Sequence, residues 1–295
     1  MKLGYYPGCT LKTKAANLEK AAMAALDLLG VEYQELDRWN CCGAVFSLAD
    51  DDLIHHVASV RNLVRAQDQG VDTVVTLCSQ CYNTLARANL LMRTDDEKRD
   101  TINRFMYEEN DYECNIEVVH FLQVLRDQVG WEALKQKVVR PLDGLKVAPF
   151  YGCTLVRPED VSIDPLGGGI LEDFLRAIGA EPATFTAATE CCGSYQMLAH
   201  PEAGIERASK VILSANRSEA DALILSCPLC EYNLGTRQPD VVGASEDLAP
   251  IPTFYFTQLL AVALGLDPEV FRLDLNGPSA AALLTEKNFI AAASA

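Results

Sequence analysis

The sequence predicts an α/β protein of two lobes, related by a pseudo-twofold axis and built on mainly parallel sheets. Two observations lead to this fold class. The same five-cysteine pattern occurs twice along the chain, and in each half short apolar runs typical of buried strands alternate with amphipathic helix patterns. A chain of 295 residues is long enough for two domains of ordinary size. We therefore predict an N-terminal domain over residues 1–140 and a C-terminal domain over residues 141–295.

The predicted strands run directly into cysteines. Four short apolar segments have this property: Lys2–Tyr6, Asp72–Leu77, Leu145–Tyr151 and Asp221–Leu225. In parallel α/β sheets ligands bind at the carboxyl ends of the strands. Each lobe should therefore gather its cysteines at one edge, because each strand is followed at once by one of Cys9, Cys78, Cys153 and Cys227.

Helices are predicted between these strands. An amphipathic pattern over Leu18–Leu29 ends at Gly30, and a similar pattern over Leu171–Ile178 ends at Gly179. The residues after each C-x-x-C also follow a helical pattern. The charged segment 94–113 is predicted to be a helical surface insertion without a counterpart in the second half, and the alanine-rich tail after Asn276 a peripheral helix. The glycine run 167–169 lacks nucleotide-motif spacing, so we interpret it as a helix-entry loop.

Composition and charge exclude several classes of protein. The formal net charge of −16 argues against a nucleic-acid-binding protein, which would need a surface rich in lysine and arginine. The apolar stretch from Ile251 to Leu266 is shorter than a membrane span, so a buried element is expected there. The N-terminus lacks the features of a secretory signal, and we expect a cytoplasmic protein. Eleven cysteines in a reducing compartment are not expected to form disulfides.

The cysteines fall into two matched sets of five once Cys114 is left out. Each set has a single cysteine, then a vicinal pair followed by glycine, then a C-x-x-C, and the two sets are offset by 144, 150, 150, 149 and 149 residues. The flanking residues repeat as well, since Gly8-Cys9-Thr10-Leu11 recurs as Gly152-Cys153-Thr154-Leu155. The first set is Cys9, Cys41, Cys42, Cys78 and Cys81, and the second is Cys153, Cys191, Cys192, Cys227 and Cys230.

Three interpretations of these sets are open from the residues alone. Buried structural cysteines would explain a single thiol, but packing does not require two vicinal pairs each followed by glycine. A structural zinc ion bound by four cysteines usually uses two neighbouring C-x-x-C motifs, whereas here the two are far apart and six cysteines would be left over. Thiolates are the standard ligands of iron–sulfur clusters, and glycine beside a cysteine allows the tight turn such ligation needs.

The pattern, with a spacing of 31 residues before the first Cys-Cys-Gly and 37 before the second, resembles the duplicated cysteine-rich CCG domain family, in particular the B subunits of heterodisulfide reductases. The resemblance covers residues 3 to about 264. It implies that each set of five cysteines holds one non-cubane [4Fe–4S] cluster. All ten ligand positions are filled in this chain.

The resemblance also implies a function. In this family a disulfide, such as the heterodisulfide of coenzyme M and coenzyme B, is reduced between the two clusters. The expected partners are a ferredoxin-like C subunit, a flavin-containing A subunit and a small-molecule disulfide. The alternative is an electron-transfer component of a bacterial heterodisulfide-reductase-like complex with another acceptor, and the alternative of a different class is a structural zinc protein.

Substrate residues are less clearly marked than the ligands. Lys12 and Arg157 lie shortly after the first cysteine of each half and are candidates for binding an anionic group of the substrate. His120 aligns with Tyr255 in the second half and is a candidate proton donor to a leaving thiolate. Solvated surface charge and a buried structural histidine are the competing interpretations.

Overall fold

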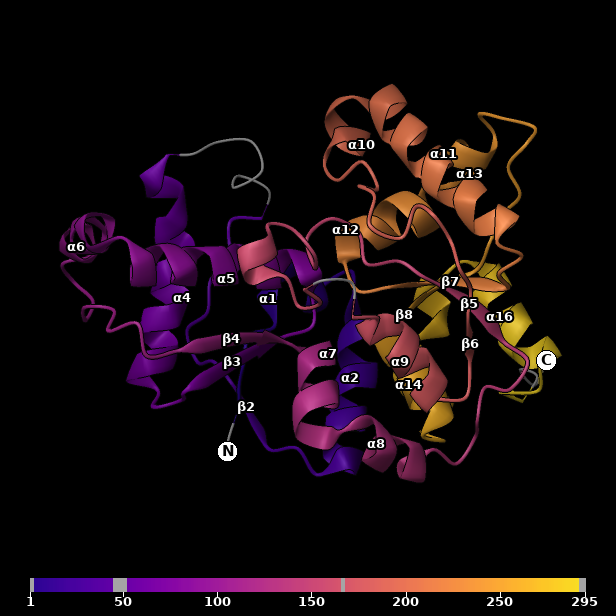
Figure 1. Ribbon diagram of the computed structural model, residues 1–295, viewed down its shortest axis with the longest axis horizontal. Helices are drawn as coiled ribbons and strands as arrows, with labels where there is room; N and C mark the ends of the chain where they lie inside the picture. Colours follow the sequence, from indigo (N-terminus) through magenta and orange to yellow (C-terminus); the bar gives the residue numbers. More distant parts are fainter. Residues whose placement is uncertain (1–2, 45–51, 166–167, 292–295) are drawn as a thin grey trace.

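The structure is a computed structural model that describes residues 3–44, 52–165 and 168–291. It contains two four-stranded sheets, and every strand pair in them is parallel (Figure 1). This confirms the predicted fold class. The first sheet has the order β2-β1-β3-β4, formed by Leu3–Tyr5 (β1), Tyr33–Glu35 (β2), Thr73–Thr76 (β3) and Glu117–His120 (β4).

The second sheet repeats this order as β6-β5-β7-β8. Its strands are Lys146–Pro149 (β5), Glu181–Pro182 (β6), Ala222–Leu225 (β7) and Thr253–Tyr255 (β8). In each sheet the order in which strands are added reverses between the first and third strands of its half, β1 and β3 or β5 and β7. Such a switch point leaves a crevice at the carboxyl ends of the two strands, where α/β proteins bind their ligands.

The helices of the first half follow the predicted pattern. Ala16–Leu29 (α2) ends with Gly30 in the left-handed conformation at φ +72°, as the sequence predicts. The other helices are Gly8–Leu11 (α1), Val57–Asp68 (α4), Ser79–Thr94 (α5), Asp96–Phe105 (α6), Phe121–Val124 (α7) and Trp131–Lys137 (α8).

The second half contains further helices, the longest of which has 17 residues. They are Ile170–Ala177 (α9), Gln196–Ala199 (α10), Pro201–Arg217 (α11), Pro228–Glu231 (α12), Gln238–Val242 (α13), Phe256–Ala263 (α14), Pro268–Phe271 (α15) and Pro278–Glu286 (α16). Gly169 lies directly before α9, as expected of a helix-entry loop, while Gly167 and Lys2 lie outside the described residues. The predicted tail helix is present as α16.

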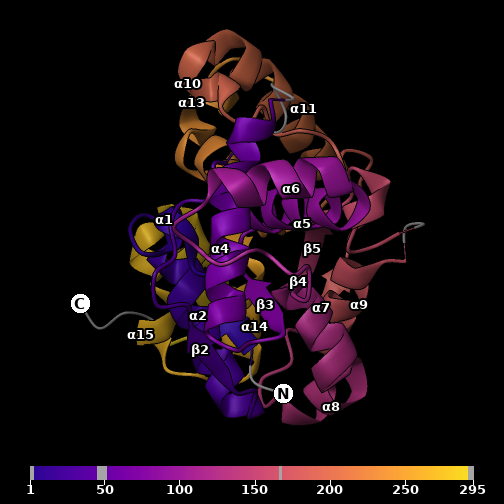
Figure 2. The ribbon, with the colours of Figure 1, turned by 90° about the vertical axis from the view of Figure 1, so that its left-hand side faces the viewer.

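One helix prediction was too long. In the segment 94–113, Thr94 ends α5, a separate helix covers only Asp96–Phe105, and residues 107–113 continue as an irregular segment. Tyr112 is buried in this segment, and its hydroxyl donates to Asn89 Oδ1 at 2.7 Å. Tertiary packing of Tyr112 therefore holds the irregular segment in place where the charged sequence suggested a continuous helix. Figure 2 shows α4 and α6 on the outer side of the first lobe.

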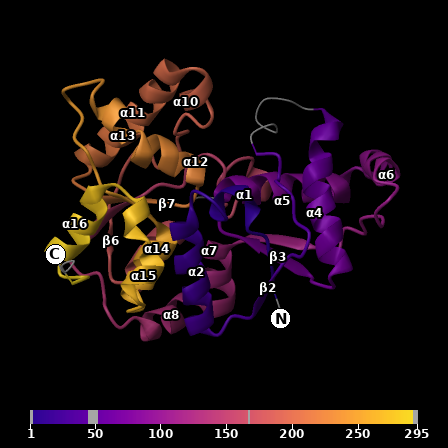
Figure 3. The ribbon, with the colours of Figure 1, turned by 180° about the vertical axis from the view of Figure 1, so that it is seen from behind.

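The two lobes share a layer of helices between their sheets. Helix α14, from the end of the chain, packs along α2, from its beginning (Figure 3), and α7 packs near α9 (Figure 1). Thr257 Oγ1 donates to Leu18 O at 2.9 Å, and the Phe256 ring contacts His120, Phe121 and Phe174. The domain boundary at residue 140 stays a prediction, because this shared core joins both halves.

The shared layer also explains the long apolar stretch near the C-terminus. Residues 253–263 form β8 and α14, and α14 is buried along its whole length. Among the described residues, no helix has both the length and the apolar composition needed to cross a membrane.

We expect the shared layer to control stability. Phe256→Ala should lower the free energy of unfolding by about 3–5 kcal/mol, because it removes a fully buried ring that touches both halves. Denaturant unfolding followed by circular dichroism measures this change. Phe105→Ala, at a ring that is 57% exposed, is the matched control and should change it by less than about 0.5 kcal/mol. Equal effects of the two variants would contradict the shared core.

Candidate functional site

The ten cysteines of the two matched sets form one row that runs through both lobes. In the first lobe Cys9 Sγ lies 3.9 Å from Cys41 Sγ, and Cys42 Sγ lies 3.6 Å from Cys81 Sγ. The thiols of Cys41 and Cys42, and those of Cys81 and Cys78, also interact, because each member of these pairs shifts the pKa of the other. The second lobe repeats the same order of links, from Cys153 through Cys191, Cys192 and Cys230 to Cys227.

The two halves of the row meet at Cys78 and Cys227. These thiols are close enough to shift each other's pKa, raising that of Cys78 and lowering that of Cys227, and both are buried. Next to them, Ser79 N donates to Ser226 O at 3.1 Å across the interface. Each of the two cysteines ends a strand segment and caps the following helix, α5 or α12. The C-x-x-C motifs therefore form the contact between the lobes, while Cys9 and Cys41 are exposed at one end of the row.

The row is charged unevenly. A hydrogen bond from Cys41 holds the pKa of the Cys42 thiol well below its usual value, and hydrogen bonds from Cys230 and Cys78 do the same for Cys227. A hydrogen bond from Cys153 lowers the pKa of Cys191 to about 2. The donating partners shift the other way, so the thiols share protons along the row. Metal binding replaces such protons, because thiolates are the ligating form.

Glycines bring the backbone close to the sulfur atoms. A Cβ atom on Gly8 would lie 3.0 Å from Cys81 Sγ, and one on Gly152 would lie 3.6 Å from Cys230 Sγ. Both glycines have positive φ angles, of +71° and +64°, which other residues rarely adopt. A side chain at Gly8 would therefore intrude on the space around a thiol that the first set needs for a ligand.

Backbone N–H groups also face the vicinal cysteines. Ala44 N donates to Cys42 Sγ at 3.4 Å, and Gly43 N–H favours the thiolate of Cys41. In the second lobe, Gly193 and Ser194 do the same for Cys191 and Cys192. The donor set is thus all thiol, with glycine-lined space and N–H groups directed at sulfur, as in protein sites for iron–sulfur clusters. Within the described ranges, no group of three or more His, Cys, Asp or Glu side chains is arranged to hold one metal ion.

The predicted substrate residues lie in different surroundings. Lys12 Nζ lies 2.6 Å from Glu19 and 2.7 Å from Glu35, so two carboxylates compensate its charge. Arg157 Nη1 donates to Thr189 O at 3.1 Å and lines a cavity of about 490 Å³ beside the loop that carries Cys153. The same cavity is lined by Glu159, Asp164 and Glu172, so its carboxylates outnumber its one arginine.

His120 lies in the interface, fully buried, with both ring nitrogens engaged. Nδ1 accepts from Leu122 N at 3.3 Å, so Nε2 carries the proton and donates to Leu77 O at 3.0 Å. Leu77 O corresponds to Ser226 O in the other half, which accepts from Ser79. The matching donor for Leu77 would be residue 228, but this is proline and has no N–H. His120 therefore replaces a missing backbone donor, and a role toward substrate stays a prediction.

Sequence reasoning missed the polar residues that support the row. Asn83 Nδ2, on α5, donates to Thr154 O at 2.9 Å and to Arg157 O at 2.7 Å in the second lobe. Asn233 Nδ2 donates to Cys192 O at 2.9 Å, and Asn40 binds the loop before Cys41. Asn40 directly before the first Cys-Cys was visible in the sequence, but the second half has Glu190 there, so the repeat did not draw attention to it.

The burial of His120 predicts a pH effect on stability. Burial lowers its pKa to about 4, below the 6.5 of an exposed histidine, so the unfolded chain binds more protons between these values. The free energy of unfolding should fall as pH decreases from about 6.5 to about 4, by up to about 3 kcal/mol. His120→Gln should remove this part of the pH dependence. Denaturant titrations of both proteins across that range measure it, and identical pH profiles would contradict the assignment.

Comparisons with known proteins agree with the repeat. Residues 3–86 and 147–235 match the family described as "Cysteine-rich domain" (CCG). A Wolinella succinogenes protein named "8-methylmenaquinol:fumarate reductase membrane anchor subunit" is 33% identical over 281 residues, which cover 93% of this chain and 96% of that protein. The B subunit of the ferredoxin/F(420)H(2)-dependent CoB-CoM heterodisulfide reductase of Methanosarcina acetivorans is 29% identical over 282 residues, 93% of each protein.

The fold is also found in a solved structure. A hypothetical protein from Helicobacter pylori superposes with a TM-score of 0.74 at 17% sequence identity. The match covers 93% of this chain but only 51% of the Helicobacter chain, so this chain spans about half of it. This likeness supports the two-lobe architecture alone.

Proposed function

This chain belongs to the cysteine-rich CCG domain family, whose domain it contains twice, and on that premise we propose that it is an iron–sulfur protein with two clusters. Each set of five cysteines would hold one non-cubane [4Fe–4S] cluster. The ligands of the first are Cys9, Cys41, Cys42, Cys78 and Cys81, and those of the second are Cys153, Cys191, Cys192, Cys227 and Cys230. Its eleven free thiols suit a reducing compartment, the cytoplasm.

The observation that carries the proposal is the meeting of both sets at the lobe interface, where Ser79, next to Cys78, donates to Ser226, next to Cys227. Five thiols in each lobe supply more ligands than a zinc ion takes, and the order of links is the same in both lobes. Two adjacent clusters would supply one electron each, which matches the two electrons that reduction of a disulfide to two thiols requires. The reaction also takes up two protons.

The proposed activity is therefore reduction of a disulfide, either the heterodisulfide of coenzyme M and coenzyme B or a related one. Relatives named as B subunits of heterodisulfide reductases support it. The chain's own contribution is to bury the inner thiols, to direct N–H groups at the vicinal pairs and to bind the substrate. Both candidate cations, Lys12 and Arg157, border cavities that carboxylates also line, and Lys12 is in addition paired directly with two of them.

A second function has a specific observation in its favour. The 33% identical Wolinella protein is named as part of a fumarate reductase, so the same two-lobe arrangement would also suit electron transfer to an acceptor other than a disulfide. In either case the chain works within a larger complex. The proposed partners are a ferredoxin-like C subunit and a flavin-containing A subunit of the heterodisulfide reductase type.

We expect anaerobically purified protein to contain about eight iron atoms per chain, from two four-iron clusters. Elemental analysis and the visible spectrum measure this, and the colour should bleach on reduction. Cys114→Ser is the control variant and should keep full iron content, because Cys114 Sγ lies apart from the row and donates to Met92 O at 3.2 Å. A stoichiometric zinc content without iron would reject the cluster assignment.

Cys42→Ser and Cys192→Ser should each abolish reduction of a disulfide substrate, because each removes one ligand of a vicinal pair. The assay uses the complex with its electron-donating partner and compares disulfides with fumarate as acceptors. Disulfide turnover retained in both variants would contradict the mechanism. Turnover with fumarate alone in the wild-type complex would favour the second function.

A further inference from the structure

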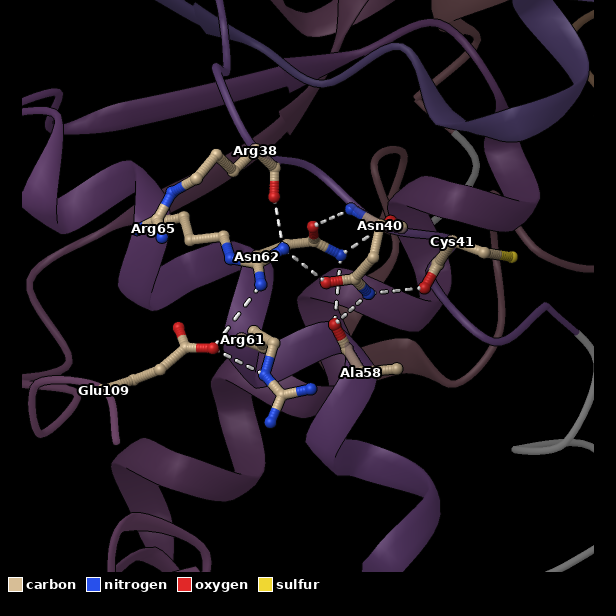
Figure 4. Close-up of polar contacts among 8 residues, drawn as sticks. All are labelled: Arg38, Asn40, Cys41, Ala58, Arg61, Asn62, Arg65 and Glu109. Carbon is tan, nitrogen blue, oxygen red and sulfur yellow. Dashed lines mark hydrogen bonds and ion pairs between the residues drawn. The ribbon is translucent and has the colours of Figure 1, made fainter. Parts of the chain in front are cut away.

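We propose that Asn40 is a positioning residue for the first cluster site, and that Glu109 of the charged segment 94–113 fixes it through Arg65 (Figure 4). The inference rests on the proposed function, since it concerns the cluster that Cys41 and Cys42 would hold. The proposal assigns a role in the first cluster site to the segment 94–113, which has no counterpart in the second half of the repeat.

Asn40 uses each of its polar atoms in hydrogen bonds. Its backbone N–H donates to Asn62 Oδ1 at 2.8 Å, and its carbonyl accepts from Tyr6 OH at 2.8 Å and Asn62 Nδ2 at 3.0 Å. Its side-chain Nδ2 donates to Cys41 O and to Ala58 O, both at 2.9 Å. Asn40 therefore ties the backbone before the vicinal pair to helix α4, which carries Ala58 and Asn62.

Arg65 completes this network. Its Nη1 donates to Asn40 Oδ1 at 2.9 Å and also to Arg38 O. Its Nη2 lies 3.4 Å from Glu109 Oε1, and Arg61 Nε lies 2.7 Å from the same oxygen. The Arg65 and Glu109 side chains are only 19% and 17% exposed, so water screens the contact weakly. Glu109 thus orients the guanidinium that holds the Asn40 amide.

The other side of the loop is held as well. Ala44 O accepts from Gln80 Nε2 at 3.0 Å and from Thr84 Oγ1 at 3.1 Å, and Ser59 Oγ donates to Cys42 O at 2.8 Å. Between the two anchors, Gly43 and Ala44 adopt positive φ angles of +92° and +52°. This unusual backbone directs their N–H groups at the sulfurs of the vicinal pair. Loss of the Asn40 anchor would release those N–H groups from sulfur.

The second lobe supports its vicinal pair differently. The residue that aligns with Asn40 is Glu190, which is exposed and lies before Cys191. There, Asn233 Nδ2 donates to Cys192 O at 2.9 Å and to Ser194 O at 3.0 Å from the other side of the loop. The segment 94–113 therefore acts on the first lobe alone. The two sites have the same arrangement of thiols, but different residues hold their loops. A substitution can therefore disturb one site and leave the other unchanged.

The test is an EPR-monitored redox titration of the full-length protein with its clusters loaded under anaerobic conditions. N–H groups at sulfur stabilise the reduced cluster, so Asn40→Ala should shift the reduction potential of one cluster to more negative values and leave the other in place. Glu109→Gln should cause a smaller shift in the same direction. The sign is decisive, because loss of a negative charge alone would raise the potential.

Two matched variants assign the effect to one lobe. Asn233→Ala should shift the cluster that Asn40→Ala leaves unchanged, and Glu190→Ala should shift neither. Unchanged potentials in both Asn40→Ala and Glu109→Gln would overturn the inference, as would an equal shift of both clusters or a positive shift in Glu109→Gln. Wild-type protein without two titrating clusters would instead reject the proposed function. Glu109→Gln keeps the test available if Asn40→Ala does not fold.

Discussion

The contact between the two C-x-x-C motifs is the constraint on which the rest of the structure depends. Cys78 and Cys227 meet at the interface because each follows the third strand of its half, and Ser79 N–H donates to Ser226 O beside them. The reciprocal bond is impossible at Pro228, and His120 supplies the missing donor from the end of β4. Parallel sheets with a switch point bring thiols to one edge. Only this interface brings two such edges together and turns two separate sets into one row.

Much of this arrangement follows from the sequence. The strands that end before Cys9, Cys78, Cys153 and Cys227, and the stop of α2 at Gly30, could be predicted because hydrophobic period and glycine position act locally. The shared helix layer could not, since nothing in α2 or α14 alone specifies which apolar face covers the other. The segment 94–113 was predicted as helix throughout. Its charged residues favour helix locally, but packing of Tyr112 and pairing of Glu109 hold its second half in an irregular form.

The polar supports were beyond sequence reasoning for a different reason. Asn40, Asn83 and Asn233 act through backbone carbonyls of residues far away in the chain, and such acceptors leave no pattern in side-chain identity. Duplication conceals them further, because the repeat emphasises what the halves share. The structure instead shows matched thiols with unmatched supports. Hydrogen bonds around the ligands tune the reduction potential of a cluster. Two clusters with the same set of ligands can therefore differ in reduction potential when different residues support them.

The most direct test of the two-cluster arrangement is anomalous diffraction at the iron edge from crystals of the anaerobically purified protein. The account predicts two separate groups of iron peaks, one against each set of five cysteines, on opposite sides of the Cys78–Cys227 contact. A single metal peak at that contact, a signal at the zinc edge alone, or iron bound to only one set would contradict it.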